Sequence, residues 1–338
     1  MKIVFFGTPQ FAVPSLERLL AHPSFDVVAV VTQPDKRRGR GSKVTPSPVK
    51  AAAQASRNAS NSDCPIWQPE RIKKDRDTLT QLDALKADAF VVIAYGQILS
   101  QQILDMPRLG CINAHGSILP AYRGAAPIQW CLYKGERETG VTTMLMDAGM
   151  DTGPMLMKET VAIDLLDNAW QVAEKLSALS AAMLPATLEK LHQQIIRPIT
   201  QVDEQATYAP LIKKEDYRLD WGKSAKALHD QVRGFYPSCT AQFRGEALKV
   251  MATVPLGTDY WQDLPPAFTN IKALYEAANI AEGTLPGTIA STFKRYGPVV
   301  QTGSGYLLLC EMKPAGKKVL SGWDFVNGNR VEIGEQLG

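Results

Sequence analysis

The chain has 338 residues, of which 45% are hydrophobic and 21% are charged, and its formal net charge is +3. These values are typical of a soluble globular protein, and the length favours two domains. No apolar run approaches the roughly 20 residues that a membrane-spanning helix needs, so we expect no contact with a membrane.

The first half of the chain has the pattern of an α/β domain. Strands are expected over residues 1–6, 27–32, 89–94 and 109–112, and helices over residues 14–20 and 168–191. Continuous apolar strands with helices between them indicate a parallel sheet that is buried on both faces. We therefore predict a Rossmann-like, open and parallel-rich sheet with helices on both faces for residues 1–195. The first turn, Gly7-Thr8-Pro9, lacks the Gly-x-Gly-x-x-Gly pattern, so we expect no nicotinamide and no flavin.

A different pattern begins after residue 195. Residues 196–209 are polar with scattered prolines, which favours a linker. A short helix is expected over residues 224–233, followed by strands over residues 240–244, 247–254, 287–293, 297–302 and 306–312. Several short strands separated by turns indicate a small β-barrel, which we assign to residues 210–338. Residues 256–283 form a long segment between strands, with a helix expected at 272–281 and no function assigned.

Residues 34–50 are strongly basic. They hold six basic residues and one acid, Asp35, a net charge of +5 in a chain whose total is +3. The basic residues are Lys36, Arg37, Arg38, Arg40, Lys43 and Lys50. A charge run is usually a solvated surface, and one rich in glycine and proline is often flexible. This run follows the end of a predicted strand, so we interpret it as an insertion loop for a polyanionic partner.

Asn113 and His115 lie where an apolar run gives way to a Gly/Ser/Pro turn. Alternate residues of a strand point the same way, so both side chains should face one spot at the edge of the sheet where ligands bind. Two polar residues at a strand end are more often structural. A second glycine-rich turn, residues 146–154, supplies a carboxylate from Asp147 or Asp151. An amide, an imidazole and a carboxylate can polarise a carbonyl group and move a proton.

These segments together resemble the folate-dependent formyltransferases. The resemblance rests on residues 2–12, 32–35, 39–41, 46–50, 94–99, 109–129 and 146–157. The family pattern of an apolar residue, Asp, a small residue and Gly before an apolar strand fits Asp151 better than Asp147. We therefore expect Asp147 to be a turn or capping carboxylate. Arg123 is expected to be a structural ion-pair member rather than a residue of the substrate entrance.

The resemblance implies an activity and a catalytic site. The implied reaction moves the formyl group of 10-formyltetrahydrofolate to the amino group of initiator methionyl-tRNA. Asn113, His115 and Asp151 would be catalytic: Asn113 and His115 would stabilise the formyl oxygen, and Asp151 would orient His115 and relay the amine proton. How His115 and Asp151 divide the proton transfer is left open. The folate would lie against the segment Ser117, Ile118, Leu119 and Pro120, with residues 94–99 as a wall of the pterin pocket.

The resemblance also implies a nucleic-acid site and a second domain. The basic loop would grip the acceptor arm of the tRNA through Lys36, Arg37, Arg38, Arg40 and Lys43, with Arg40 at its tip. The barrel of residues 210–338 would be an OB-like tRNA-binding domain, with a second basic contact at Lys313, Lys317 and Lys318. We expect the protein to act as a monomer.

The cysteines and histidines point to a reducing compartment without a metal. Five cysteines are scattered along the chain and no Cys-x-x-Cys occurs, which favours free thiols and a cytoplasmic location. The four histidines are equally dispersed, so no metal site is expected.

Three other functions share part of the pattern. A formyltransferase acting on glycinamide ribonucleotide or an amino-sugar nucleotide would use the same three catalytic residues, but a small substrate needs neither the basic loop nor the barrel. A deformylase that sends the formyl group to water would carry a domain before the core, whereas the first strand here starts at Lys2. An RNA-binding barrel protein with an inert α/β domain would have no use for the catalytic residues.

Overall fold

The structure is a computed structural model that describes residues 1–38, 43–60, 64–278, 280 and 284–338. The chain divides into two compact units, of which the first comprises residues 1–125, 139–161 and 173–209. The second unit comprises residues 126–138, 162–172 and 210–338. The predicted linker therefore belongs to the first unit, and two segments expected in the first domain belong to the second. Among the described helices, none has both the length and the apolar character that crossing a bilayer requires.

The first unit is built on a seven-stranded sheet in the order β5-β2-β1-β6-β7-β8-β9. Its strands are β1 (Lys2–Gly7), β2 (Asp26–Val31), β5 (Ile66–Trp67), β6 (Ala89–Ile93), β7 (Cys111–His115), β8 (Glu138–Leu145) and β9 (Met155–Ala162). Pairing is parallel from β5 through β2, β1 and β6 to β7, and β8 runs antiparallel to β7. This confirms the predicted parallel-rich sheet.

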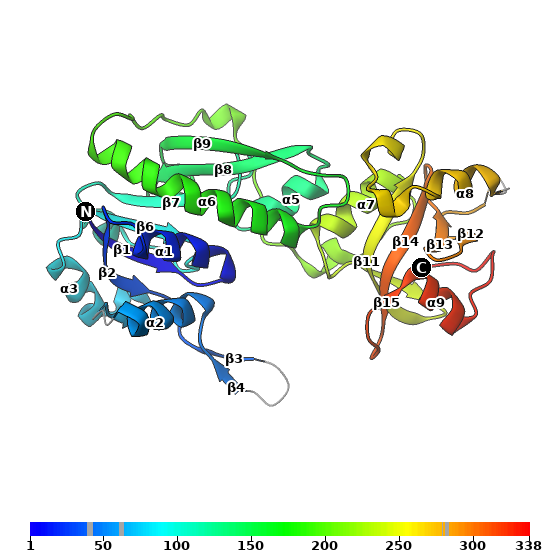
Figure 1. Cartoon of the computed structure of the whole chain (residues 1–338), viewed down its shortest axis with the longest axis horizontal. Helices are drawn as coiled ribbons and strands as arrows, with labels where there is room; N and C mark the ends of the chain where they lie inside the picture. The colour runs from blue at the N-terminus through cyan, green and yellow to red at the C-terminus, as the bar shows by residue number, and fades with distance from the viewer. Residues whose placement is uncertain (39–42, 61–63, 279, 281–283) are drawn as a thin grey trace. The chain divides into compact units, whose positions relative to one another are not determined.

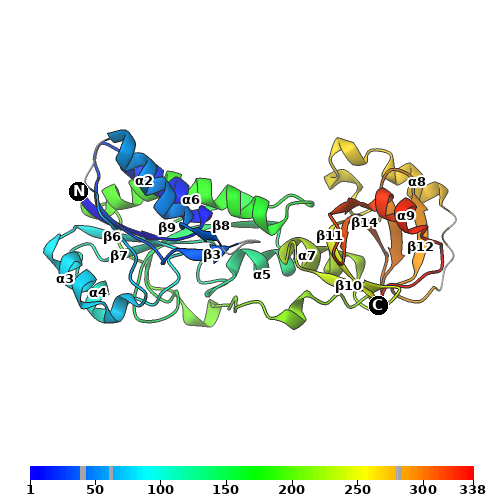
Figure 2. The ribbon, with the colours of Figure 1, turned by 90° about the horizontal axis from the view of Figure 1, so that it is seen from below.

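Helices cover both faces of this sheet (Figures 1 and 2). They are α1 (Val13–Leu20), α2 (Pro48–Ser60), α3 (Arg76–Ala84), α4 (Gln101–Leu104) and α6 (Ala169–His192). Figure 2 shows α2 and α6 on one face, and α3 and α4 on the other. In β1, Phe6 packs with Leu82 of α3 and Ile103 of α4, while the adjacent residue Phe5 is fully buried on the opposite face. Burial on both faces explains why β1 is an unbroken apolar run.

The basic insertion differs from the expected loop. Its ends form a two-stranded antiparallel hairpin, β3 (Lys36–Arg38) with β4 (Lys43–Thr45), and α2 begins soon afterwards at Pro48. At the base of the hairpin, Asp35 accepts hydrogen bonds from Lys50 Nζ and Gln68 Nε2, each at 2.7 Å. Lys50 Nζ also donates to Gln68 Oε1 at 2.6 Å. Lys50 therefore neutralises Asp35 at the base instead of adding to the charge of the hairpin.

The second unit is built on an antiparallel sheet in the order β10-β11-β14-β13-β12, with β15 paired to β14. Its elements are α5 (Pro127–Tyr133), α7 (Ala225–Gly234), β10 (Thr240–Phe243), β11 (Glu246–Leu256), β12 (Ile289–Phe293), β13 (Gly297–Gln301), β14 (Tyr306–Pro314), β15 (Leu320–Ser321) and α9 (Gly322–Asn329). Leu228 of α7, Val250 of β11 and Leu309 of β14 meet in its core. The five strands and the helix predicted in this half are confirmed.

The last residues of the chain join the two edges of this second sheet. Leu337 bridges Phe243 at the end of β10, and Gln336 bridges Thr288 next to β12. The C-terminal segment thus covers both edge strands, as closure of a small barrel requires. This arrangement is compatible with the predicted barrel, and the OB-like class stays a prediction.

Residues 256–278, the described part of the segment 256–283 apart from Ile280, have a structural role that the sequence did not reveal. Within this segment α8 (Ile271–Ala277) buries Ile271 in an apolar cluster with Leu256, Phe293 and Leu308. These partners belong to β11, β12 and β14. The segment therefore covers an apolar part of the second sheet, and the predicted helix is present but ends at Ala277.

Candidate active site

Asn113 and His115 lie among the last three residues of β7 and are separated by one residue. Asn113 pairs with Val92 of β6 on one side and with Met144 of β8 on the other, so the site sits in the middle of the sheet. The carboxyl ends of β1, β6 and β7 share this edge, which is where open α/β sheets bind ligands. The Asn113 side chain is half-buried, and across the described residues it has no hydrogen-bond partner. Its carboxamide is therefore free to bind a substrate.

The buried His115 imidazole is oriented by a backbone carbonyl. His115 Nε2 lies 3.0 Å from the carbonyl oxygen of Tyr122. A carbonyl oxygen can only accept, so we assign the proton to Nε2. In the neutral ring, Nδ1 then carries the lone pair, and this atom faces Asp151 Oδ2 at 3.7 Å. The ring can thus take up a proton on the side where a carboxylate stabilises the resulting charge.

Asp151 reaches His115 from the loop between β8 and β9. Its Oδ2 accepts a hydrogen bond from the backbone N–H of Gly124 at 2.8 Å. The backbone of Asp151 is left-handed, with φ of 55°. Non-glycine residues rarely adopt this conformation, and such residues cluster at functional sites. Arg123 is therefore flanked by Tyr122, which holds the imidazole, and by Gly124, which holds the carboxylate.

A cavity of about 250 Å³ lies beside Asp151. Its wall is mostly apolar and comes from residues 97–99 and 146–151 together with Leu104 and Met144. Ligand pockets of about 300–1,000 Å³ enclose drug-sized molecules, so this cavity can hold one flat heterocycle. Residues 97–99 belong to the segment that the sequence predicted as a pocket wall. The methionines at 144, 146 and 150 were not predicted, because single apolar residues are equally expected in a core.

Known proteins are similar in sequence to this chain over its whole length. The family described as "Formyl transferase" matches residues 1–188, and "Formyl transferase, C-terminal domain" matches residues 211–330. The chain belongs to the formyl transferase family. This formyl transferase is 60% identical over 338 residues to a protein of Trichormus variabilis named methionyl-tRNA formyltransferase, with 100% of this chain and 99% of the relative covered. A protein of the same name from Nostoc sp. is 58% identical over 340 residues, with the same coverage.

Solved structures show the same fold at low sequence identity. A sugar 3N-formyl transferase, WlaRD, crystallised with dTDP and 5-N-formyl-THF, aligns with a TM-score of 0.61 at 17% identity, covering 94% of this formyl transferase and 99% of that chain. HypX from Aquifex aeolicus in complex with tetrahydrofolic acid aligns with a TM-score of 0.59 at 13% identity, covering 99% and 48% respectively. At these identities the likeness concerns the fold.

The four residues predicted to contact folate do not line the cavity beside Asp151. Ser117 and Leu119 are fully buried, and Ser117 Oγ donates to the carbonyl oxygen of Ala121 at 2.6 Å. Thr142 ties this segment to β8, since its hydroxyl donates to the Ser117 carbonyl and accepts from the Leu119 N–H. Ile118 and Pro120 are partly exposed. In the formyl transferase Ser117 and Leu119 therefore shape the turn.

The basic residues of the hairpin follow the carboxyl end of β2, which runs parallel to β1, β6 and β7. The hairpin therefore lies on the side of the sheet where the carboxyl ends of the parallel strands meet, which is also the side of Asn113 and His115. The exposed Lys36 and the residues Arg37 and Arg38 belong to β3, and Lys43 belongs to β4. Arg40, predicted at the tip, lies outside the described residues.

Two further predictions about polar residues are confirmed. Asp147 is a turn carboxylate, since its Oδ1 accepts from Gly149 N at 3.0 Å and from Thr152 Oγ1 at 2.7 Å. Arg123 is a buried ion-pair member, with Nη2 donating to Asp203 Oδ1 at 2.8 Å. Sequence reasoning missed Tyr122 and Gly124 as the anchors of His115 and Asp151, because both act through backbone groups that any residue possesses.

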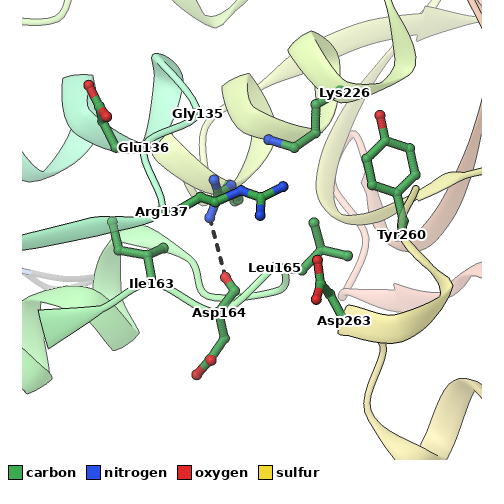
Figure 3. Close-up of a pocket in the computed structure, with 10 residues that line it drawn as sticks. Gly135, Glu136, Arg137, Ile163, Asp164, Leu165, Lys226, Tyr260 and Asp263 are labelled. Carbon is green, nitrogen blue, oxygen red and sulfur yellow. Dashed lines mark hydrogen bonds between the residues drawn. The ribbon is translucent and has the colours of Figure 1, made fainter.

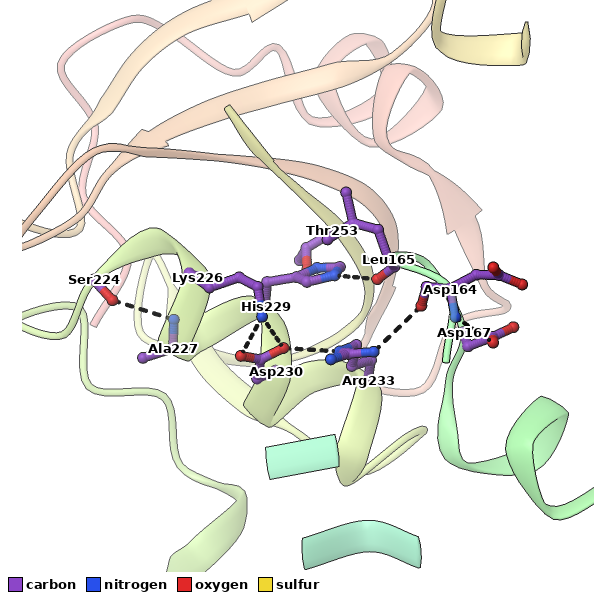
Figure 4. Close-up of polar contacts among 10 residues, drawn as sticks. All are labelled: Asp164, Leu165, Asp167, Ser224, Lys226, Ala227, His229, Asp230, Arg233 and Thr253. Carbon is purple, nitrogen blue, oxygen red and sulfur yellow. Dashed lines mark hydrogen bonds and ion pairs between the residues drawn. The ribbon is translucent and has the colours of Figure 1, made fainter. Parts of the chain in front are cut away.

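The second unit has a cavity of its own, of about 300 Å³, which is lined by charged residues (Figure 3). The guanidinium of Arg233 donates to Asp230 Oδ1 at 2.8 Å, and Lys226 Nζ donates to both Asp230 oxygens. Figure 4 shows these ion pairs beside His229, whose ring nitrogens lie 2.8 Å from the Leu165 carbonyl and 2.9 Å from Thr253 Oγ1. With both nitrogens bonded, this imidazole ties the segment 162–172 to α7 and is not available for catalysis.

Burial lowers the pKa of His229 to about 4, so the ring is neutral near pH 7. Within the described ranges, no group of three or more His, Cys, Asp or Glu could hold a metal ion.

Proposed function

We propose that this protein transfers the formyl group of 10-formyltetrahydrofolate to the amino group of initiator methionyl-tRNA, giving formylmethionyl-tRNA for translation initiation. The observation that carries the proposal is the end-to-end identity of 60% with a relative named methionyl-tRNA formyltransferase. The sugar 3N-formyl transferase WlaRD, which would favour a small amine as acceptor, is only 17% identical. We accordingly propose a cytoplasmic location, since translation initiation consumes the product. We also propose that the protein acts as a monomer.

Asn113 stabilises the oxygen of the formyl group. When the neutral amine attacks the formyl carbon, that carbon becomes tetrahedral and its oxygen gains negative charge. The free Nδ2–H of Asn113 donates to this oxygen. Removal of one such donor typically lowers the rate by about 10²–10³. The half-exposed position of Asn113 at the end of β7 supports this role.

His115 accepts the proton that the attacking amine loses. Its Nε2–H stays on the Tyr122 carbonyl, so the proton arrives at Nδ1, directly or through one water. Asp151 Oδ2, 3.7 Å away, stabilises the imidazolium. The proton then passes to N10 as the bond between N10 and the formyl carbon breaks, which restores the neutral ring. This division of labour makes His115 the proton carrier and Asp151 its counter-charge.

The cavity beside Asp151 accommodates the heterocycle of the folate. Apolar side chains such as Ile98, Leu99 and Met144 suit a flat ring, and the cavity's polar edge at residues 147–151 lies at the catalytic carboxylate. The cavity encloses only part of a folate, so the remainder lies along the rim. Ile118 and Pro120 are the members of the predicted folate segment that remain exposed for such a contact.

The basic hairpin binds the acceptor arm of the tRNA. Lys36, Arg37, Arg38, Arg40 and Lys43 contribute five positive charges, and the acid next to them, Asp35, is neutralised by Lys50. Contacts of Lys and Arg with phosphates give an affinity that falls steeply with salt. The position of the hairpin at the catalytic edge of the sheet supports this role.

The test offers labelled 10-formyltetrahydrofolate together with methionyl-tRNA, glycinamide ribonucleotide, an amino-sugar nucleotide or water in parallel. We expect label in methionyl-tRNA at a kcat/KM at least 100-fold above that for the small amines, and little hydrolysis. Preferential formylation of either small amine would refute the proposed acceptor. Preferential release of formate would indicate a deformylase, and no turnover with any acceptor would leave an RNA-binding protein as the better interpretation.

A further inference from the structure

The loop that carries Asp151 has a backbone that needs outside support. Asp151 has a left-handed φ of 55°. Two residues later, Gly153 packs so tightly that a Cβ would lie 1.9 Å from the carbonyl oxygen of Leu145. A non-glycine residue in a left-handed conformation persists only where its surroundings hold it. The position of the Asp151 carboxylate therefore depends on contacts made to this backbone.

Gln201 makes those contacts. Its Nε2 donates to the carbonyl oxygen of Asp151 at 2.8 Å and to that of Gly153 at 2.7 Å. Both protons of one buried amide nitrogen are thus donated to the carbonyl groups on either side of Thr152, near the end of the loop. Gln201 belongs to the polar segment 196–209, which the sequence predicts to be a linker. A backbone bridge between Met155 and Ile199 attaches this segment to β9, just after the loop.

Arg123 decides which way the Gln201 amide points. Arg123 Nε donates to Gln201 Oε1 at 3.0 Å, and only 1% of the Arg123 surface is exposed. A guanidinium can only donate, so the amide oxygen must face Arg123 and the amide nitrogen must face the loop. The backbone atoms of Tyr122 and Gly124, on either side of Arg123, hold the His115 imidazole and the Asp151 carboxylate. One short segment thus supports His115, the carboxylate and the loop.

We propose that Gln201, oriented by Arg123, is a positioning residue that sets the Asp151 carboxylate against His115. This inference rests on the proposed formyl transfer. It makes residues 196–209 part of the catalytic apparatus of the first unit. Gln201 acts through Asp151 and touches no reacting atom, so its loss lowers kcat.

The test is Gln201→Glu, which keeps the size of the side chain and the acceptor for Arg123. A carboxylate oxygen then faces two carbonyl oxygens, so the loop is repelled instead of held. We expect kcat, measured with both substrates saturating, to fall about 10- to 100-fold. The matched control is Gln205→Glu, the same change on an exposed side chain four residues along. The control should keep wild-type kcat.

A double-mutant cycle separates positioning from general structural damage. Once Asp151→Asn has removed the carboxylate, adding Gln201→Glu should lower kcat by less than about twofold, because residues that act as a unit are not additive. Wild-type kcat in Gln201→Glu would overturn the inference, and so would the same fold loss in both backgrounds. If Gln201→Glu does not fold, Gln201→Met, which removes the donors without adding charge, takes its place in the same cycle.

The acceptor and the positioning role can fail separately. If the wild-type protein formylates another amine, the proposed acceptor is refuted, and the cycle is run with that amine. A non-additive result would then still support Gln201 as a positioning residue, and an additive result would overturn it.

Discussion

Replacing Asn113 by alanine should slow catalysis strongly while leaving the fold intact. The carboxamide is half-exposed and has no hydrogen-bond partner among the residues that the structure describes, so its removal leaves no buried polar group unpaired. Its neighbours in the sheet, Val92 and Met144, pair with it through the backbone, which the substitution retains. The free energy of unfolding should therefore change by no more than about 0.5 kcal/mol.

The rate should fall far more than the stability. If Asn113 donates to the developing oxyanion, its loss costs about 2.7–4 kcal/mol of transition-state stabilisation, a decrease in kcat of about 10²–10³. The measurement is kcat at saturating methionyl-tRNA and 10-formyltetrahydrofolate, with urea unfolding on the same samples. Asn270→Ala, at an exposed position before α8, is the matched control and should leave both quantities unchanged.

Two results would refute the reasoning about Asn113. A variant with kcat within about threefold of wild type would show that the carboxamide does not bind the oxyanion. A variant that loses more than about 2 kcal/mol of stability would show that the side chain has a structural partner. In the second case the loss of rate would say nothing about the transition state.

The remaining predictions concern the hairpin and the second unit. Lys36→Ala combined with Arg40→Ala should raise the KM for methionyl-tRNA and leave the KM for folate unchanged. The slope of log affinity for tRNA against log salt concentration should fall by about one unit per lost phosphate contact. An equal rise in both KM values would indicate misfolding. Gln68→Ala should also weaken tRNA use selectively, because it removes one partner of Lys50 at the base of the hairpin; an unchanged kcat/KM for methionyl-tRNA would contradict this. Because burial lowers the pKa of His229 from 6.5 to about 4, the unfolded chain gains a proton that the folded chain lacks as pH falls below 6.5. Stability should therefore drop by on the order of 1–2 kcal/mol between pH 7.5 and 5, and His229→Gln should reduce this drop in urea unfolding; an equal drop in the variant would exclude His229 as its source.

Strands β1, β2, β6 and β7 of the first sheet and β10 to β14 of the second were predicted from the sequence, whereas β5 and β8 were not. In β1 and β6 every position from Ile3 to Phe6 and from Ala89 to Ile93 is buried, so the apolar run and the strand coincide. The helix α6 was found within one residue at each end, since its apolar periodicity extends over its full length. For β7 the apolar run predicted a strand over residues 109–112, whereas the strand spans Cys111–His115. Asn113 and His115 are therefore alternate residues within the strand itself.

Features that depend on distant partners could not be predicted. The strands β3 and β4 consist of Lys, Arg, Val and Thr, with no alternating apolar face, and are joined at their base by Asp35, Lys50 and Gln68. Helix α5 belongs to the second unit because it packs on α7, about 100 residues later. The polar segment around Gln201 has the composition of a linker, and only the folded chain shows that its amide meets the loop of Asp151.

The arrangement around Arg123 explains why this site can be assembled from separate parts of the chain. His115 comes from a strand, Asp151 from a loop with a strained backbone, and Gln201 from a segment with little regular structure. Each would be poorly placed alone, but all three are hydrogen-bonded to the tripeptide 122–124, either to its backbone or to the Arg123 side chain. Because these bonds share one short segment, a shift of that segment moves all three groups together. The distance between His115 and Asp151 is therefore set by the tripeptide rather than by direct attraction across 3.7 Å.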